Sequence, residues 1–196
     1  DLHMLDTRLI GRDQQVSYSN YTGLKTKQKP VHILNKSPNQ FDTKQFNHDL
    51  LKPNRSILGV DQEMWLESRL KKTNAMWTIL GQQVMLAPQR WSVTKDLIER
   101  ESSESSQELN MVMQKETIKP ELTKNLDAWD GYPAARSRLY KAITEHKKKL
   151  ITLSGDTHFS SAHNLVNQNG QLIGAEFGTT SVTSPSFWDN VKIDKI

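Results

Sequence analysis

Apolar residues gather in a few short blocks of this chain, and long polar stretches separate the blocks. In the block 133–149, Pro133 precedes apolar residues at helical spacing, and lysines close the block, so the pattern predicts a helix. The short apolar strand 150–154 follows at once. Because a helix that leads directly into a strand is the unit of an α/β fold, we expect a mixed sheet with helices packed against it.

The other apolar blocks extend the same picture. Asp61 is a suitable N-cap for a helix over 62–72, whose last turn carries two lysines. The dipeptide Asn169-Gly170 is typical of a two-residue hairpin turn. Further apolar segments that read as strands or buried pieces are 2–5, 76–81, 84–87 and 171–177.

Two long stretches, 14–54 and 89–120, show neither a period of 2 nor a period of 3.6. We expect them to be mostly exposed and irregular, apart from a short strand at 31–34. The stretch 89–120 could instead form a lid over an active site. His32 and His48 stand alone in the first stretch, so solvated or capping roles are favoured for both.

Composition excludes several classes of protein. The 196 residues carry a net charge of +4 from 26 basic and 22 acidic side chains scattered along the chain, so no nucleic-acid partner is expected. Without cysteine, disulfides and thiolate metal sites are excluded. No apolar run approaches the roughly 18 residues that cross a membrane. The chain opens at Asp1 within an apolar pattern, which indicates part of a larger domain.

The segment Gly155-Asp156-Thr157-His158 holds the strongest candidate chemistry. It follows the predicted strand 150–154, and ligands of open α/β sheets bind beyond the carboxyl ends of the strands. A carboxylate suits hard cations and an imidazole suits transition metals, so Asp156 and His158 are candidate metal ligands. The alternative is an Asx-type turn in which His158 is only hydrogen-bonded.

Arg8 is a second candidate. It follows the apolar segment 2–5, and its planar guanidinium could bind a phosphate or a carboxylate. The alternative is a structural pairing of Asp6 with Arg8 or Arg12 that fixes the loop. His163 could be structural or functional. The Ser/Thr-rich run 178–185 could line a phosphate pocket, but a tight strand end is favoured.

The order of several motifs resembles the PhoD-type alkaline phosphatases of the metallophosphoesterase superfamily. The resemblance covers nearly the whole chain and is specific in combination. The motifs that carry it are Met4-Leu5-Asp6-Thr7-Arg8, Ile57-Leu58-Gly59 with Gln62 and Trp65-Leu66, Asp127-Ala128-Trp129-Asp130-Gly131-Tyr132-Pro133-Ala134-Ala135-Arg136, Gly155-Asp156-Thr157-His158 and Glu176-Phe177-Gly178-Thr179-Thr180-Ser181-Val182-Thr183-Ser184.

The resemblance implies a β-sandwich of mixed sheets flanked by helices, with a metal cluster at one end that hydrolyses a small phosphoester. It implies iron with calcium, with zinc or manganese as alternatives, in a periplasmic or secreted enzyme. Asp156 and His158 match the last metal-ligand motif, and Asp127 or Asp130 matches an upstream ligand, with Asp127 preferred. Arg8 matches a basic position that we assign to catalysis, and Arg136 one that we assign to substrate binding.

The earlier metal-binding acids of the family have no counterpart in this sequence, whereas a two-metal site needs ligands for both ions. The chain, 1–196, therefore resembles the C-terminal half of the phosphatase domain, and alone it could be inactive. The alternative function is an inert phosphatase-like module that binds a partner or associates with itself. A serine hydrolase is disfavoured because no Gly-x-Ser-x-Gly segment is present.

Overall fold

A computed structural model describes residues 1–21, 41–89, 125–180 and 183–185. These residues form a mixed α/β structure with one five-stranded sheet, in the order β1-β2-β3-β5-β4. The strands are β1 (Leu2–Met4), β2 (Trp77–Gln82), β3 (Lys149–Ser154), β4 (Ser161–Val166) and β5 (Leu172–Gly178). The helices are η1 (Tyr18–Tyr21), α1 (Thr43–Leu50), α2 (Val60–Lys72), η3 (Trp129–Gly131) and α5 (Pro133–Glu145).

Four neighbouring strands run parallel, and β4 alone is antiparallel to its neighbour β5. The β4–β5 connection confirms the predicted hairpin, with Gly170 at φ 76°. Its turn is longer than the predicted two residues, because the Gly170 amide donates to the carbonyl of Asn167 and the Asn167 amide to that of Gln171. The mixed α/β class with flanking helices is therefore confirmed. The described residues form one sheet, so the second sheet of the expected sandwich is not seen among them.

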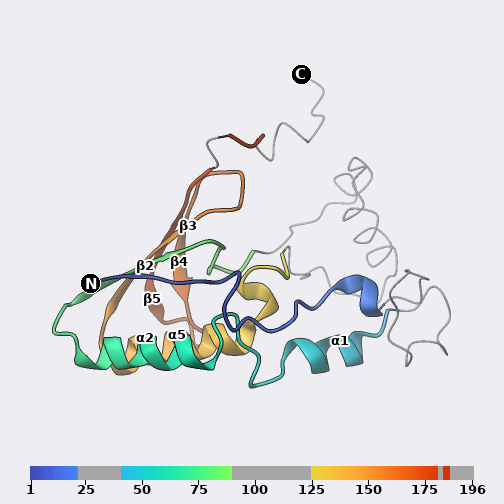
Figure 1. Cartoon of the computed structure of the whole chain (residues 1–196), viewed down its shortest axis with the longest axis horizontal. Coiled ribbons are helices and arrows are strands. Elements are labelled where there is room, and N and C mark those ends of the chain that lie inside the picture. The colour runs from blue at the N-terminus through green and yellow to red at the C-terminus, as the bar shows by residue number, and fades with distance from the viewer. Residues whose placement is uncertain (22–40, 90–124, 181–182, 186–196) are drawn as a thin grey trace.

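The two faces of the sheet differ sharply. Figure 1 shows α2 and α5 side by side along one face. On that face Leu80, Thr152 and Glu176 share one row across the sheet and are fully buried. On the opposite face Leu153 and Phe177 are neighbours in the register and remain 47% and 49% exposed. The core of the described structure therefore lies between the sheet and the two helices.

The start of α2 differs from the expected one. The helix begins at Val60, after Gly59, whose φ of 75° requires a residue that tolerates a left-handed conformation. A side chain at Gly59 would also collide with the backbone of Gly11. Asp61 therefore lies in the first turn, where its charge still favours the helix dipole, and it is not the N-cap.

Helix α1, of eight residues, lies within the stretch 14–54, which was expected to be mostly irregular. Asp42 caps the helix by accepting a hydrogen bond from the Gln45 amide at 3.0 Å. Phe46 and Leu50, four residues apart, bury themselves in a small separate core. That core also contains Tyr21 and Leu126, which are distant in sequence, so the short helix depends on contacts that no local period reveals.

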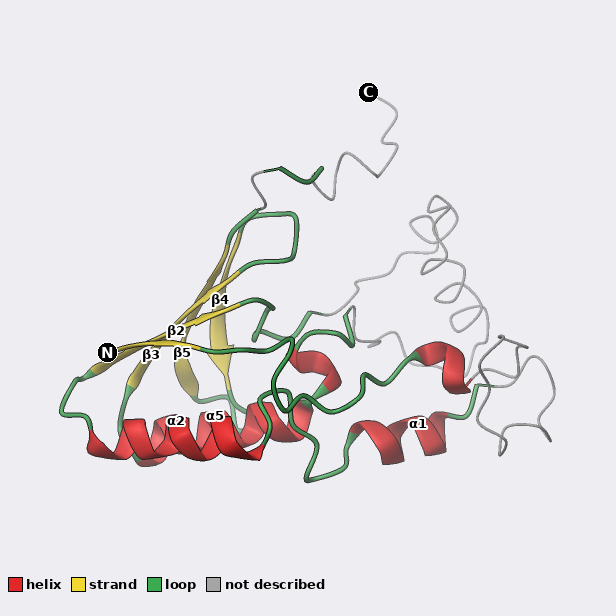
Figure 2. Ribbon diagram, viewed as in Figure 1, coloured by secondary structure: helices red, strands yellow, loops and turns green. Residues whose placement is uncertain are grey.

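Figure 2 shows α1 set apart from the sheet, with a loop that leads from its end to α2. Residues 22–40, which include the strand expected at 31–34 and His32, lie outside the described residues, as does 90–120 with its possible lid. His48 is described and is exposed, next to Asp49.

Candidate functional site

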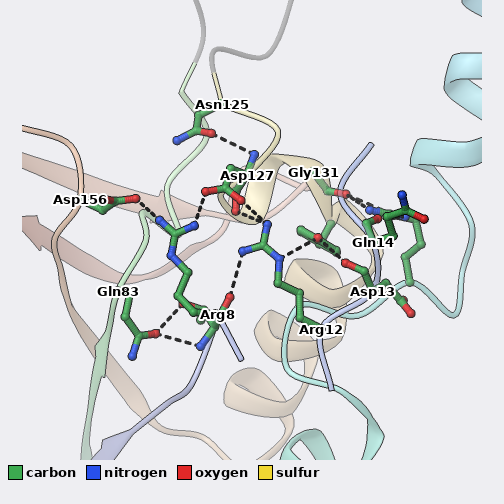
Figure 3. Close-up of polar contacts among 12 residues, drawn as sticks. Arg8, Arg12, Asp13, Gln14, Gln83, Asn125, Asp127, Gly131 and Asp156 are labelled. Carbon is green, nitrogen blue, oxygen red and sulfur yellow. Dashed lines mark hydrogen bonds and ion pairs between the residues drawn. The ribbon is translucent and has the colours of Figure 1, made fainter. Parts of the chain in front are cut away.

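Two carboxylates from distant parts of the chain meet at one arginine. Asp127 lies just before η3 and Asp156 lies in the turn after β3. Arg8, in the loop after β1, donates from Nη1 to Asp127 and from Nη2 to Asp156 (Figure 3). The two acids keep 30% and 44% of their side chains exposed. Asp127 and Asp156, two of the three residues expected to lie together with His158, thus meet at Arg8, at the carboxyl ends of parallel strands.

A second arginine holds Asp127 from the other side. The Arg12 guanidinium donates to Asp127 Oδ1 at 2.5 Å and to its backbone carbonyl at 2.9 Å. It also donates to the carbonyl of Thr7 at 3.0 Å and to the Tyr132 hydroxyl at 3.1 Å. Arg12 is almost fully engaged, with 11% of its side chain exposed, and therefore fixes Asp127.

The loop that carries Arg8 is held by Asp6. Asp6 Oδ1 accepts hydrogen bonds from the amides of Leu9 and Arg8, and these bonds lower the pKa of the Asp6 carboxyl below its ordinary 3.8. Gln62 of α2 pairs with the backbone of Asp6 through two bonds of 2.8 Å. The expected side-chain pairing of Asp6 with Arg8 or Arg12 is therefore wrong, because Asp6 binds backbone amides and leaves both guanidinium groups to the other acids.

Asp156 and His158 share an unusual backbone conformation. Their φ angles are 63° and 57°, in the left-handed region that residues other than glycine rarely adopt. Such conformations cluster at functional sites, where the surrounding structure holds them in place. His158 is partly exposed, and its Nδ1 lies 2.8 Å from the carbonyl of Pro185. Within the described structure His158 forms no hydrogen bond or ion pair with Asp127 or Asp156.

By contrast, Asp130 and Arg136 are largely buried. Asp130 has 5% of its side chain exposed and pairs through Oδ1 with Arg136 at 2.6 Å. Its Oδ2 accepts from the amide of Gln89 at 2.7 Å. Arg136 also donates to the carbonyl of Leu86 at 3.3 Å. Both predicted site residues are thus engaged in holding the segment after β2.

Sequence reasoning assigned no role to Gln83 and Glu176. Gln83 Oε1 accepts from the Thr7 amide at 2.8 Å and from its hydroxyl at 2.6 Å, next to Arg8. Glu176 is a fully buried acid in β5. A charged residue inside an apolar strand is a signal that could have singled out Glu176, whereas nothing in the sequence singles out Gln83.

The carboxylates at this site are of a kind that binds metal ions, but they do not complete a metal site. The carboxylates of Asp127 and Asp156 already converge on one positive group, the Arg8 guanidinium, and carboxylate oxygens suit calcium and other hard cations. Across the residues that the structure describes, however, no three His, Asp or Glu side chains gather in a group that could hold a metal. Further ligands are needed from elsewhere.

Comparison with known proteins decides the family. The sequence model of the family described as PhoD-like phosphatase matches residues 1–195. The chain belongs to the PhoD-like phosphatase family. It is 31% identical over 137 residues to alkaline phosphatase D of Bacillus subtilis (strain 168), a match that covers 67% of this chain and 19% of that protein.

A solved structure titled "Structure of PhoD" is also similar, with 32% identity and a TM-score of 0.49, covering 67% of this chain and 22% of that one. The chain thus spans about a fifth of the length of the curated PhoD-like relative that it matches. Within the described ranges, none of the helices has the length and apolar character needed to cross a membrane.

Proposed function

We propose that this chain is part of a larger PhoD-like enzyme that hydrolyses phosphoesters with the help of metal ions. The observation that carries the proposal is the convergence of Asp127 and Asp156 on Arg8, in a chain of the PhoD-like phosphatase family. Both acids are partly exposed at the strand ends, where a small phosphoester could reach them. By the same family resemblance we propose a periplasmic or secreted location.

Asp127, Asp156 and His158 are the residues that would hold metal, together with ligands from outside the described chain. The carboxylates suit calcium, and the imidazole suits iron, zinc or manganese. When bound, such ions polarise phosphoryl oxygens and supply an activated water. Asp127 rather than Asp130 is the upstream ligand in this proposal, because Asp130 is buried and committed to Arg136.

Arg8 would bind the phosphoryl group. Its guanidinium now spans two carboxylates, and the same fork of donors matches two oxygens of a phosphoryl group. Arg8, Arg12 and the two acids balance one another, with two positive and two negative charges. A cation that takes over the carboxylates would leave Arg8 free to donate to the substrate. Arg12 keeps its backbone and Tyr132 contacts and continues to orient Asp127.

The test is hydrolysis of an aryl phosphate by the full-length enzyme before and after removal of metal with a chelator. The proposal predicts activity that chelation abolishes and that added calcium with iron, zinc or manganese restores. Replacing His158 with Ala should lower kcat on the order of a hundredfold, because a nitrogen donor is lost while the carboxylates remain. The matched control is His48→Ala, at an exposed histidine of α1, which should keep normal activity. Chelator-resistant activity, or wild-type kcat in His158→Ala, would contradict the proposal.

A second candidate function is a self-associating, catalytically inert module. The uncovered face of the sheet favours it, because exposed apolar side chains lie there in adjacent rows. They are Leu2, Met4, Leu153 and Phe177, with exposed fractions between 47% and 67%.

Sedimentation of the isolated chain tests this module. A self-associating module predicts dimers or larger species that Leu153→Gln converts to monomers, with no phosphatase activity at any metal concentration. A matched change on a helix, Met64→Gln, replaces a residue that is also exposed and should leave the assembly intact. Metal-supported hydrolysis by the isolated chain would exclude the inert module.

A further inference from the structure

A buried acid of β5, Glu176, joins the segment after β2 to the end of β3. Glu176 has no exposed surface. Its Oε1 accepts from the Leu86 amide at 2.7 Å and its Oε2 from the Ala87 amide at 2.6 Å. The Ser154 hydroxyl also donates to Oε1. Among described residues no Lys, Arg or His forms an ion pair with Glu176, so backbone amides and a hydroxyl satisfy its charge.

The first arm of this contact leads to Asp156. Ser154 is the last residue of β3, and Gly155 and Asp156 follow it directly. The backbone carbonyl of Ser154 also accepts a hydrogen bond from the Thr179 amide at 2.9 Å, just beyond the end of β5. Both the side chain and the backbone of Ser154 are therefore fixed to β5, and the turn with Asp156 at positive φ starts from a fixed point.

The second arm leads to Arg8. Leu86 and Ala87 belong to a buried segment that leaves the end of β2, and buried backbone amides outside a helix or sheet need such acceptors. Gln83, three residues before Leu86, accepts two hydrogen bonds from Thr7. Thr7 immediately precedes Arg8, and Figure 3 shows Gln83 beside Arg8. The same segment is held at its far end by Asp130.

We propose that Glu176 is a positioning residue, whose carboxylate joins the 83–87 segment to Ser154 and so sets Arg8 and Asp156 in register with each other. The proposal rests on the proposed function, in which Arg8 and Asp156 serve the same phosphoester. Glu176 touches neither substrate nor metal. A neutral apolar residue could fill the same volume, but it could not accept from three donors that belong to two different segments, the end of β3 and the segment after β2.

The test compares Glu176→Gln and Ser154→Ala in the full-length enzyme with the control Ile143→Val. Glutamine keeps the shape of Glu176, but its amide nitrogen must face one of the two backbone donors that need an acceptor. Ser154→Ala removes only the arm toward Asp156. Ile143 is buried in α5, so its substitution loosens packing without touching this polar network.

Hydrogen–deuterium exchange is the first readout, and it does not depend on activity. Glu176→Gln should speed exchange at Leu86 and Ala87, and also at Thr7 and Arg8, beyond any change in Ile143→Val. Ser154→Ala should speed exchange at Gly155 and Asp156. Faster exchange confined to residues 86 and 87, or wild-type exchange around Asp156 in Ser154→Ala, would overturn the positioning role.

Steady-state kinetics is the second readout. Glu176→Gln should lower kcat on the order of tenfold with KM little changed, because positioning is lost while the substrate contacts remain. An equal fall in Ile143→Val would make the effect one of general stability and overturn the proposal. An enzyme with wild-type Glu176 that hydrolyses no phosphoester would instead contradict the proposed function, while the exchange results would still decide whether Glu176 aligns the two loops.

Discussion

The partly exposed acids at the carboxyl ends of the strands, here called the rim, and the buried acids beneath them have opposite roles. Asp127 and Asp156 lie at the rim, partly exposed, and share an arginine that a substrate or metal could displace. Asp130 and Glu176 lie in the buried layer between sheet and helices, and their oxygens are taken by amides, a hydroxyl and Arg136. Exposure and the kind of partner, rather than residue type, therefore separate acids that are available for chemistry from acids that stabilise the fold.

The largest expected effect is at the rim. Asp156→Asn should lower kcat of the full-length enzyme on the order of a hundredfold, because a charged metal ligand is lost from the proposed site. The free energy of unfolding should change by less than about 1 kcal/mol, since an exposed ion pair contributes little. Steady-state kinetics and urea unfolding measure the two quantities, with Asp61→Asn on α2 as an exposed control. A large loss of stability with normal kcat would place Asp156 among the structural acids.

Asp130→Asn should give the reverse result. The variant leaves the Gln89 amide or Arg136 without its charged acceptor in a buried setting, at a cost of about 2 kcal/mol in the free energy of unfolding. The loss of kcat per folded molecule should be smaller than in Asp156→Asn. If urea unfolding shows unchanged stability while kcat collapses, Asp130 belongs to the rim chemistry and the comparison fails.

Buried His3 should make the free energy of unfolding depend on pH. Burial and the nearby charge of Arg69 lower the pKa of His3 below its ordinary 6.5, so the folded protein keeps His3 neutral where the unfolded chain binds a proton. Stability should therefore fall as the pH drops below 6.5 and level off below the folded pKa. Between pH 7 and pH 5 the free energy of unfolding should depend less on pH in His3→Phe than in the wild type. Equal pH dependence would mean that His3 does not contribute to it.

The smallest effect is expected at Tyr140, whose hydroxyl is buried without a hydrogen-bond partner in the described structure. Burial raises the pKa of Tyr140 to about 12, so the group stays neutral at ordinary pH. Tyr140→Phe removes an unsatisfied polar atom and should leave stability unchanged or raise it by up to about 1 kcal/mol. A clear loss of stability on thermal or urea unfolding would mean that the hydroxyl has a partner, such as a buried water.

Much of the fold follows from local sequence signals. Pro133 marks the start of α5, the apolar run 150–154 becomes β3, and Asn169-Gly170 makes the β4–β5 turn. The meeting of Asp127 with Asp156 follows too, because helix α5 leads away from the site and β3 leads back to it, whereas His158, expected with them, hydrogen-bonds to Pro185. Each of these features depends on residues close in sequence or on the rule that parallel strands end together.

The division between rim and buried acids could not be predicted. Asp127 and Asp130 belong to one motif, and only the tight turn of η3 sends one to Arg8 and the other to Arg136. The roles of Gln83 and Glu176 depend on segments that lie about 76 and 90 residues away, respectively, so no local pattern encodes them. Long-range hydrogen bonds decided these assignments.

The most direct test of the central claim is a crystal of the full-length enzyme grown with manganese and measured for anomalous scattering. The claim that Asp127 and Asp156 form the working site predicts a metal peak bound by Asp156 and Asp127, with the Arg8 guanidinium withdrawn from at least one of them. A metal peak at Asp130, with Arg8 still joined to both rim acids, would contradict it.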